Sequence, residues 1–420
     1  MSVSATVQID PVVVAPEART ELVEYCRRRY THCTVVSDER TWEVSGKAIA
    51  EALESAGVRV GIVLLAGEEV VADERFLTDG FVQADVDTEA FISAGSGTIT
   101  DITRFVSHRM RRAFISAPTA ASVDGYTSKG SPLVVRGVKK SIYSHGPEAL
   151  FADGNVLRDA PHELTAAGFS DIIGKITSIA DWRLGRLVWE EPYDEAIAER
   201  TLETVRQSVE ARHEIGRGEE AGILTLMNAL IESGLCMLDF GASRPASGAE
   251  HHISHFWEMQ LLRYGKPGIL HGAKVGVATV MVCRLYERVR SLDAAEVQRH
   301  LESTTPATFE EECSVIRSAY GSLAGDVIEA HRALLGLAGE VLDGIRERIV
   351  ANWESIRAIA DEVPSTETVR GYLRDAGAPT EPSEIGLSPE LAQQGLLSGH
   401  FLRVRFTVAK LVRVLGLNPG

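Results

Sequence analysis

The sequence predicts an α/β domain with a mainly parallel sheet, followed by an all-α domain. Short β-branched runs alternate with helical periodicity in the first part of the chain, whereas long helical patterns dominate after about residue 160. The length of 420 residues is also more than one hydrophobic core usually serves. We therefore expect two domains, 1–160 and 161–420, with the boundary near 154–161.

Four short apolar runs in the first domain are expected to form strands. They cover 33–37, 59–66, 91–94 and 113–116. A helix is expected over 42–56, where apolar residues recur at helical spacing and Gly57 ends the pattern. Strand–helix–strand alternation of this kind implies parallel strands covered by helices.

The second domain is expected to consist of helices joined by loops, because its apolar residues recur at helical spacing and strand signals almost vanish. The expected helices cover 193–214, 219–236, 251–264, 272–289, 309–322 and 339–359. A loop-rich stretch at 377–389 connects later helices.

Composition and charge limit the possible functions. Hydrophobic residues make up 45% and charged residues 24%, as in ordinary globular proteins. The net charge of −16 argues against nucleic-acid binding, which needs a basic face. It leaves room for an anionic small substrate, because a cationic pocket or a metal can override the overall field.

The sequence also carries expectations about cellular location. The five cysteines are scattered and form no C-x-x-C pair, which favours reduced thiols over a disulfide framework or a thiolate zinc cluster. Residues 1–14 lack the basic flank and apolar core of a signal peptide, and no stretch reaches about 18 uncharged apolar residues. We expect a cytoplasmic protein without a membrane segment.

A glycine turn lies between the third expected strand and the helical segment after it. Gly95, Ser96 and Gly97 precede Thr98 and Ile99 in the pattern G-x-G-x-x-x-D, which is not the Rossmann G-x-G-x-x-G. Such a turn can bring a phosphate close to the backbone at a helix N-terminus. Two glycines can also serve a purely structural turn, and the pattern alone leaves both interpretations open.

Asp38, at the end of the first expected strand, also has two interpretations. Its carboxylate could accept hydrogen bonds from an adenosine ribose, as acidic residues do in dinucleotide-binding domains. It could equally cap a turn.

Three histidines cluster at the start of the expected helix 251–264. His251 and His255 are four residues apart and share a helix face, whereas His252 points about 100° away. Another histidine, His271, starts the next helical pattern. Histidines at this spacing can converge on a metal, and a carboxylate from elsewhere would complete a catalytic set. A metalloprotease is disfavoured, because Glu250 precedes the pair instead of following His251 as in H-E-x-x-H.

Five segments resemble, in order and spacing, motifs of sn-glycerol-1-phosphate dehydrogenases. They are SGTITDITRF (96–105), SAPTAASVDGYTS (116–128), GFSDIIGKITSIADWRL (168–184), SRPASGAEHHISHFWE (243–258) and LHGAKVGVATV (270–280). This family belongs to the superfamily of glycerol dehydrogenase, iron-containing alcohol dehydrogenases and dehydroquinate synthase, so the resemblance implies the dehydroquinate synthase-like fold. Ser96 stands where the family commonly has glycine, which is tolerated if its φ is negative. Val123-Asp124 replaces a more usual His-Asp.

The resemblance implies a role for each matching residue. Domain 1–160 would bind NAD or NADP, with Gly95 to Ile99 at the pyrophosphate and Thr119 and Ser128 near the nicotinamide half. Domain 161–420 would bind metal and substrate. Asp171, His251 and His271 would hold one divalent ion, zinc or nickel, while Asp124 would bind the substrate and His255 would contact it and relay a proton.

The implied reaction is the reduction of dihydroxyacetone phosphate to sn-glycerol 1-phosphate, by a homodimer. Candidate phosphate binders are Lys139, Lys140, Arg244 and Lys274, although each is better interpreted as a solvated surface residue. One alternative is a dehydrogenase of another phosphorylated ketone or sugar. Another is a dehydroquinate synthase-like cyclase, which is disfavoured because 123–128 lacks that class's V-G-G-K-T-G-type segment.

Overall fold

The computed structural model describes residues 9–136 and 138–419. Contacts within the chain divide it into two compact units, Met1–Ile172 with Arg206–Gly241, and Ile173–Val205 with Ala242–Gly420. The first unit contains the α/β part of the chain, and the second is helical. The expected order, an α/β region followed by a helical region, is confirmed. The domain limits inferred from the sequence remain a prediction.

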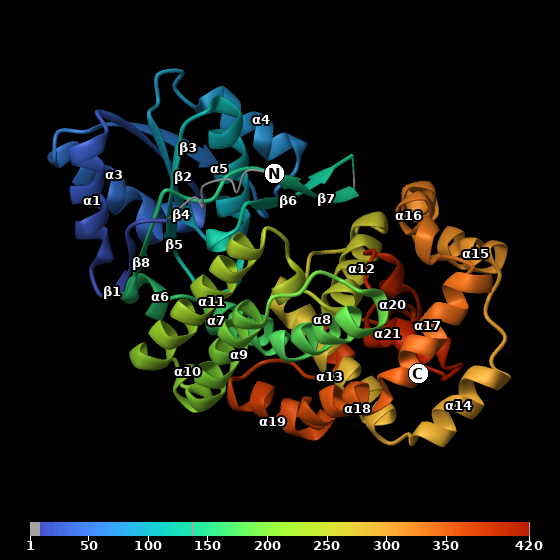
Figure 1. The fold of residues 1–420 in the computed structure, drawn as a ribbon. Coiled ribbons are helices and arrows are strands. Elements are labelled where there is room, and N and C mark those ends of the chain that lie inside the picture. Colours follow the sequence, from blue (N-terminus) through green and yellow to red (C-terminus); the bar gives the residue numbers. More distant parts are fainter. Residues whose placement is uncertain (1–8, 137, 420) are drawn as a thin grey trace. The chain divides into compact units, whose positions relative to one another are not determined.

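A six-stranded parallel sheet forms the centre of the first unit (Figure 1). Its strands, in spatial order, are β1 (Val12–Ala15), β8 (Ala149–Asp153), β5 (Ala113–Pro118), β4 (Ala90–Gly95), β2 (His32–Asp38) and β3 (Arg59–Leu65). The four expected strands correspond to β2, β3, β4 and β5. The sequence did not predict β1 and β8, which pair with each other in parallel.

Helices cover both faces of this sheet (Figure 1). On one face, α1 (Ala18–Arg29) and α3 (Lys47–Ser55) pack on a core that includes Val35. On the other, α4 (Glu74–Gln83) and α5 (Gly97–Met110) pack on a core that includes Val36. Successive strand residues point to opposite faces, so two covered faces explain why every residue of β2 before Asp38 is buried.

The sheet changes its direction of winding at β2. This strand pairs with β3 on one side and with β4 on the other. Asp38 ends β2, and Gly95 ends the neighbouring β4. In open α/β sheets, ligands bind outside the carboxyl ends of the strands at such a point.

The expected helix 42–56 is less regular than its sequence suggests. The structure has a short helix α2 (Glu39–Thr41), a π-helical turn at Trp42–Gly46, and then α3. A Cβ at Gly46 would lie 2.6 Å from Oγ of Ser37, so the wider turn passes close to β2.

The rest of the first unit includes a two-stranded antiparallel ribbon of β6 (Gly130–Val135) and β7 (Val138–Tyr143). Among the described residues, only α11 (Glu220–Phe240) is long and apolar enough to cross a membrane by length and composition. This is weak evidence for a membrane span, because 61% of its apolar window is buried and core helices of soluble proteins pass the same test. The other helices of this unit are α6 (Gly154–Arg158), α7 (His162–Ile173) and α10 (Arg212–Gly216).

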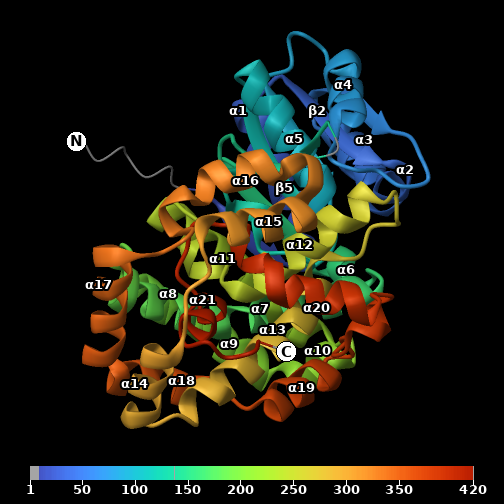
Figure 2. The same ribbon diagram turned by 90° about the vertical axis from the view of Figure 1, so that its right-hand side faces the viewer.

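The second unit is built around α13 (His271–Arg290), which is buried along most of its length. It packs against α12 (Ala249–Arg263), α18 (Trp353–Glu362), α19 (Thr366–Asp375) and α21 (Val408–Val414), as Figure 2 shows. The expected helix 339–359 is two helices, because α17 (Gly339–Ala351) ends before Asn352 and α18 begins after it. The chain's other helices are α8 (Lys175–Trp189), α9 (Glu195–Glu210), α14 (Ala294–Ser303), α15 (Phe309–Tyr320), α16 (Ala324–His331) and α20 (Pro389–Ser398).

Candidate active site

The glycine turn connects β4 to α5. Ser96 has a φ of −85°, so it avoids the left-handed region as expected, and its side chain makes no capping hydrogen bond. A Cβ at Gly95 would lie 2.5 Å from Cβ of Ile99, so only glycine fits there. The first N–H groups of α5, including those of Gly97 and Thr98, have no partner within the helix and therefore offer an anion site.

Asp38 ends β2, the strand that pairs with β4, and acts as a helix cap. Its Oδ1 accepts hydrogen bonds from the backbone N–H of Thr41 at 2.7 Å and from the Thr41 hydroxyl at 2.9 Å. Thr41 Oγ1 in turn accepts from the Asp38 N–H, which completes a capping box. The capping interpretation therefore describes the structure, and a contact with a ribose stays a prediction.

Asp124 lies in a buried segment between β5 and β6. Its Oδ2 accepts a hydrogen bond of 2.9 Å from Ser233 on α11, and its backbone N–H donates to Oδ2 of Asp171 at 3.1 Å. Thr119 follows β5, and its N–H donates to the Gly95 carbonyl at 3.3 Å. The structure thus places Asp124 beside Asp171, and Thr119 beside the glycine turn.

A buried arginine holds the segment that follows Asp124. The Arg104 guanidinium donates to the carbonyls of Gly125 at 2.5 Å and Gly130 at 2.8 Å, and it pairs with Asp101 at 2.9 Å. Burial lowers the pKa of Arg104, and the Asp101 carboxylate opposes this shift. Ser128, within the same segment, donates to the Gly125 carbonyl at 3.1 Å. Sequence reasoning missed Arg104, because an arginine in a helix is usually exposed.

Asp171 lies near the end of α7 and is completely buried. This helix approaches the Asp124 segment closely, since a Cβ at Gly168 would lie 2.0 Å from the carbonyl oxygen of Ala121. Only glycine allows that approach. It brings Asp171, one turn later, to the backbone of Asp124.

The three predicted histidines come together at the starts of two helices. His251 and His255 lie one turn apart on α12, with ring centroids 6.0 Å apart. His271 is the first residue of α13, and its ring lies 5.2 Å from that of His251 and 5.3 Å from that of His255. Burial lowers the pKa of His252 well below its usual value, so His252 stays neutral.

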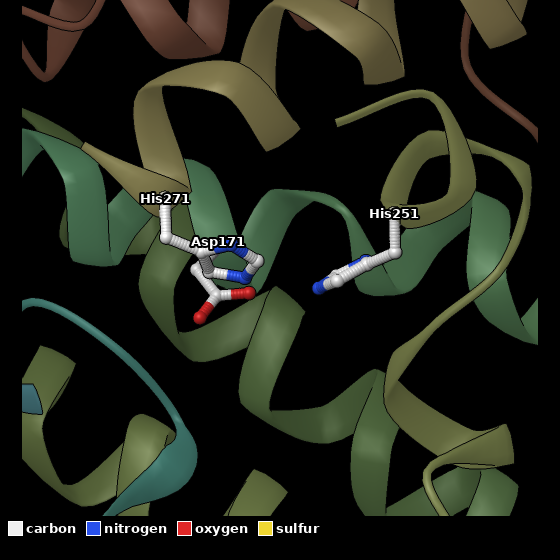
Figure 3. A group of neighbouring side chains, drawn as sticks. All are labelled: Asp171, His251 and His271. Atoms are coloured by element: carbon white, nitrogen blue, oxygen red, sulfur yellow. The ribbon is translucent and has the colours of Figure 1, made fainter. Parts of the chain in front are cut away.

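Asp171, His251 and His271 form a group that could hold a metal ion. Their ligand atoms all lie within 4.8 Å of one another, and Figure 3 shows the three side chains directed toward a common region. Two imidazole nitrogens and one carboxylate oxygen are the donors of a catalytic transition-metal site. The residues present therefore fit one divalent ion.

The carboxylate of Glu250 forms a hydrogen bond with the His251 ring. The Glu250 side chain is completely buried, and its Oε1 lies 2.8 Å from Nδ1 of His251. Burial acts to raise the pKa of Glu250, but hydrogen bonds from His251, Thr177 and Gly248 outweigh burial and lower it. The sequence shows Glu250 only as the residue before a histidine, and its contact with the ring was not predicted.

His255, Glu258 and His271 form a second group of potential ligands. Oε2 of Glu258 lies 3.3 Å from Nδ1 of His255 and 3.5 Å from Nζ of Lys274. An ion at this group would compete with the Lys274 ammonium, which makes the Asp171 group the better site.

Two of the candidate phosphate binders have carboxylate partners. Lys274 pairs with Glu258 and its side chain is only 1% exposed, so the expectation of a solvated surface lysine is wrong for this residue. Lys274 lies in the first turn of the buried helix α13, where neighbouring residues cover its side chain. Arg244 is half-buried and pairs with Glu191 at 3.3 Å.

A third group, His32, Asp85 and Asp87, lies at the amino end of β2. Arg59 contacts Nδ1 of His32 at 2.6 Å and pairs with Asp87. The guanidinium supplies the positive charge that the carboxylates require, so this group is an ion-pair network.

The architecture defines the class of protein. It is shared with an archaeal halo-thermophilic alcohol dehydrogenase from a Red Sea brine pool, which superposes with a TM-score of 0.61 at 12% identity over 96% of both chains. A sequence model of iron-containing alcohol dehydrogenases also matches residues 13–161. The chain therefore has the fold of the iron-containing alcohol dehydrogenases.

Full-length relatives narrow the assignment. Glycerol-1-phosphate dehydrogenase [NAD(P)+] of Geobacillus stearothermophilus is 38% identical over 96% of this chain and 92% of its own. The enzyme of the same name from Geobacillus thermodenitrificans is 37% identical over 99% of this chain and 95% of its own. The chain belongs to the family of glycerol-1-phosphate dehydrogenases, as its sequence motifs indicate.

Proposed function

We propose that this protein reduces dihydroxyacetone phosphate to sn-glycerol 1-phosphate with NADH or NADPH, using one divalent metal. The observation that carries the proposal is the convergence of Asp171, His251 and His271 in a chain whose full-length relatives are named for this chemistry. Zinc and nickel both suit the donor set. A homodimer in the cytoplasm is part of the same proposal.

The cofactor would bind at the carboxyl ends of β2 and β4. The first N–H groups of α5 face this position, and the uncapped turn at Gly95, Ser96 and Gly97 suits a pyrophosphate. Thr119 lies beside the same turn and Ser128 closes the segment after Asp124, in keeping with their proposed place near the nicotinamide.

Asp171, His251 and His271 would hold the metal. When bound, it acts as a Lewis acid toward the substrate carbonyl and stabilises negative charge on that oxygen. The residues around it keep this site ordered, since Asp124 and Glu250 form hydrogen bonds with two of the three ligands.

Asp124 and His255 would act on the substrate itself. The Asp124 carboxylate, held by Ser233, accepts hydrogen bonds from substrate hydroxyl groups and so orients the ketone. A bound nicotinamide would supply the hydride that reduces the substrate carbonyl. His255, whose Nδ1 lies 3.3 Å from Oε2 of Glu258, would contact the substrate and relay the proton that completes the new hydroxyl group.

The test is an activity assay with a stereochemical readout. Metal-loaded protein is mixed with dihydroxyacetone phosphate and NADH or NADPH, and the loss of nicotinamide absorbance is followed. We expect oxidation of the cofactor and a product that an sn-glycerol-3-phosphate-specific oxidase does not consume. No oxidation with this ketone, but oxidation with another phosphorylated ketone, would overturn the substrate assignment. Substrate conversion without net cofactor oxidation would indicate a cyclase.

A further inference from the structure

We propose that Glu250 is a positioning residue for His251, which fixes the direction of the imidazole ring and the nitrogen that it offers to the metal. This inference rests on the proposed metal-dependent function. Glu250, His251 and the groups that hold them all belong to the helical unit.

The contact between the two side chains determines which nitrogen of the neutral imidazole ring carries the proton. Oε1 of Glu250 lies 2.8 Å from Nδ1 of His251, and a carboxylate only accepts hydrogen bonds. Nδ1 must therefore carry the proton, which leaves the lone pair on Nε2. In Figure 3 the ring of His251 points toward Asp171 with the nitrogen farthest from its backbone in front.

The carboxylate of Glu250 is itself held in one orientation. The backbone N–H of Gly248 donates to Oε1 at 2.6 Å, and the Thr177 hydroxyl donates to Oε2 at 2.7 Å. Thr177 belongs to α8, and Gly248 is the N-cap of α12. The side chain is completely buried, so water does not compete for these bonds. Rotation of the carboxylate would break three hydrogen bonds, and Glu250 therefore acts as a rigid support for the ring.

A second buried carboxylate on α8 supplies the matched control. Asp181 accepts from the Ala249 N–H at 2.7 Å, from the Tyr286 hydroxyl at 2.7 Å and from the Val408 N–H at 2.7 Å. It therefore holds the backbone at the start of α12 without contacting the His251 ring. A purely structural role would make Glu250 and Asp181 equivalent.

The experiment compares zinc dissociation constants, measured by competition with a chelator, in Glu250→Leu, Glu250→Gln and Asp181→Asn. We expect Glu250→Leu to weaken binding by about 10- to 100-fold. Gln retains a carbonyl oxygen for the Nδ1 proton and an amide group for Thr177, so Glu250→Gln should recover most of the affinity. Asp181→Asn should lower the melting temperature but leave the constant within about threefold of wild type.

Visible absorption of the cobalt-substituted proteins provides a second readout, because it reports the geometry of the ligands. We expect an altered spectrum in Glu250→Leu and a wild-type spectrum in Asp181→Asn. Wild-type zinc affinity and spectrum in folded Glu250→Leu would overturn the proposal, as would an equal loss of affinity in Asp181→Asn.

If Glu250→Leu does not fold, Thr177→Val decides the question. It removes one of the bonds that hold the carboxylate, so we expect a rise of about threefold in the dissociation constant. An unchanged constant would overturn the proposal. Asp171→Ala distinguishes a wrong role for Glu250 from a wrong metal site. If Asp171→Ala also leaves the zinc dissociation constant unchanged, the proposed metal site itself is wrong.

Discussion

The backbone N–H of Asp124 donates a hydrogen bond of 3.1 Å to Oδ2 of Asp171. A residue proposed to bind the substrate is thereby joined to a residue proposed to bind the metal. Because the donor is a backbone N–H, this hydrogen bond does not depend on the Asp124 carboxylate. The two roles can therefore be separated by mutation.

Replacing Asp124 by Ala should reduce catalysis without releasing the metal. The Asp124 side chain accepts from Ser233 and its backbone holds Asp171, so Asp124→Ala removes only the carboxylate. We expect kcat/KM to fall by about 100-fold, because the substrate is no longer held in its reactive orientation. Metal content, measured by mass spectrometry after dialysis, should stay at one ion per chain. Loss of the metal in this variant, as expected for Asp171→Ala, would contradict the separation.

Ser233→Ala should have a smaller effect of the same kind. It removes a 2.9 Å hydrogen bond to a buried carboxylate, and bonds to charged groups contribute about 1.5–3 kcal/mol. We expect kcat/KM to fall by about tenfold, as steady-state kinetics can measure. Thr225→Ala on the same helix is the control, because its hydroxyl donates to the Ala221 carbonyl of its own helix. An equal loss in both variants would show that the Ser233 bond is not specific.

Gly95→Ala should weaken cofactor binding. The new Cβ would lie 2.5 Å from Cβ of Ile99, so the turn must shift away from its anion-binding geometry. We expect the NADH dissociation constant, measured by fluorescence titration, to rise about tenfold or more. Gly130→Ala is the matched control, since nothing lies within 4 Å of its added Cβ. Unchanged NADH affinity in folded Gly95→Ala would contradict the assignment of this turn.

The sheet could be predicted only in part from the sequence. Runs such as Val35-Val36 in β2 are apolar on both faces and long enough to be recognised. β1 and β8 have only four and five residues, and they pair with each other although they lie far apart in the sequence. The valines of β1 are β-branched, but a run of this length does not distinguish a strand from other buried segments without its tertiary partner.

The candidate site shows the same limit. Helical spacing placed His251 and His255 on one face, and the structure does so too. Asp171 came only from the family resemblance, because a single carboxylate on an apolar helix has no distinguishing pattern. Arg104 and Glu250 were missed as supports because spacing along the chain does not reveal bonds such as those of Arg104 with the Gly125 carbonyl and of Glu250 with Thr177.

Lys410 gives the helical unit a testable pH dependence. Burial lowers the pKa of Lys410 to about 8. The nearby Glu312 carboxylate acts to raise this pKa, and the Arg413 guanidinium acts to lower it further. The unfolded chain keeps the ordinary pKa near 10.4, so between these values it binds more protons than the folded protein. Wild-type stability from this group should therefore rise as pH increases from about 8 to about 10.4.

Lys410→Met removes the titrating group and therefore its contribution to the pH dependence of stability. We expect the free energy of unfolding of the variant to be about 1–3 kcal/mol higher than that of wild type near pH 7. Loss of the cation–π contact between Lys410 and the Phe401 ring would reduce this gain. The difference should shrink at about pH 9.5, where the wild-type lysine is mostly neutral. Chemical denaturation at both pH values measures it. A difference that is independent of pH would contradict the assigned pKa.

The central claim is that Asp171, His251 and His271 bind one metal ion. The most direct measurement is an anomalous difference map from a crystal of the zinc-loaded protein, collected at the zinc absorption edge. We predict one strong peak about 2.0–2.2 Å from a carboxylate oxygen of Asp171 and from a ring nitrogen of each histidine. A peak bound instead by His255 and Glu258, or a zinc-loaded crystal with no peak beside Asp171, would contradict the account.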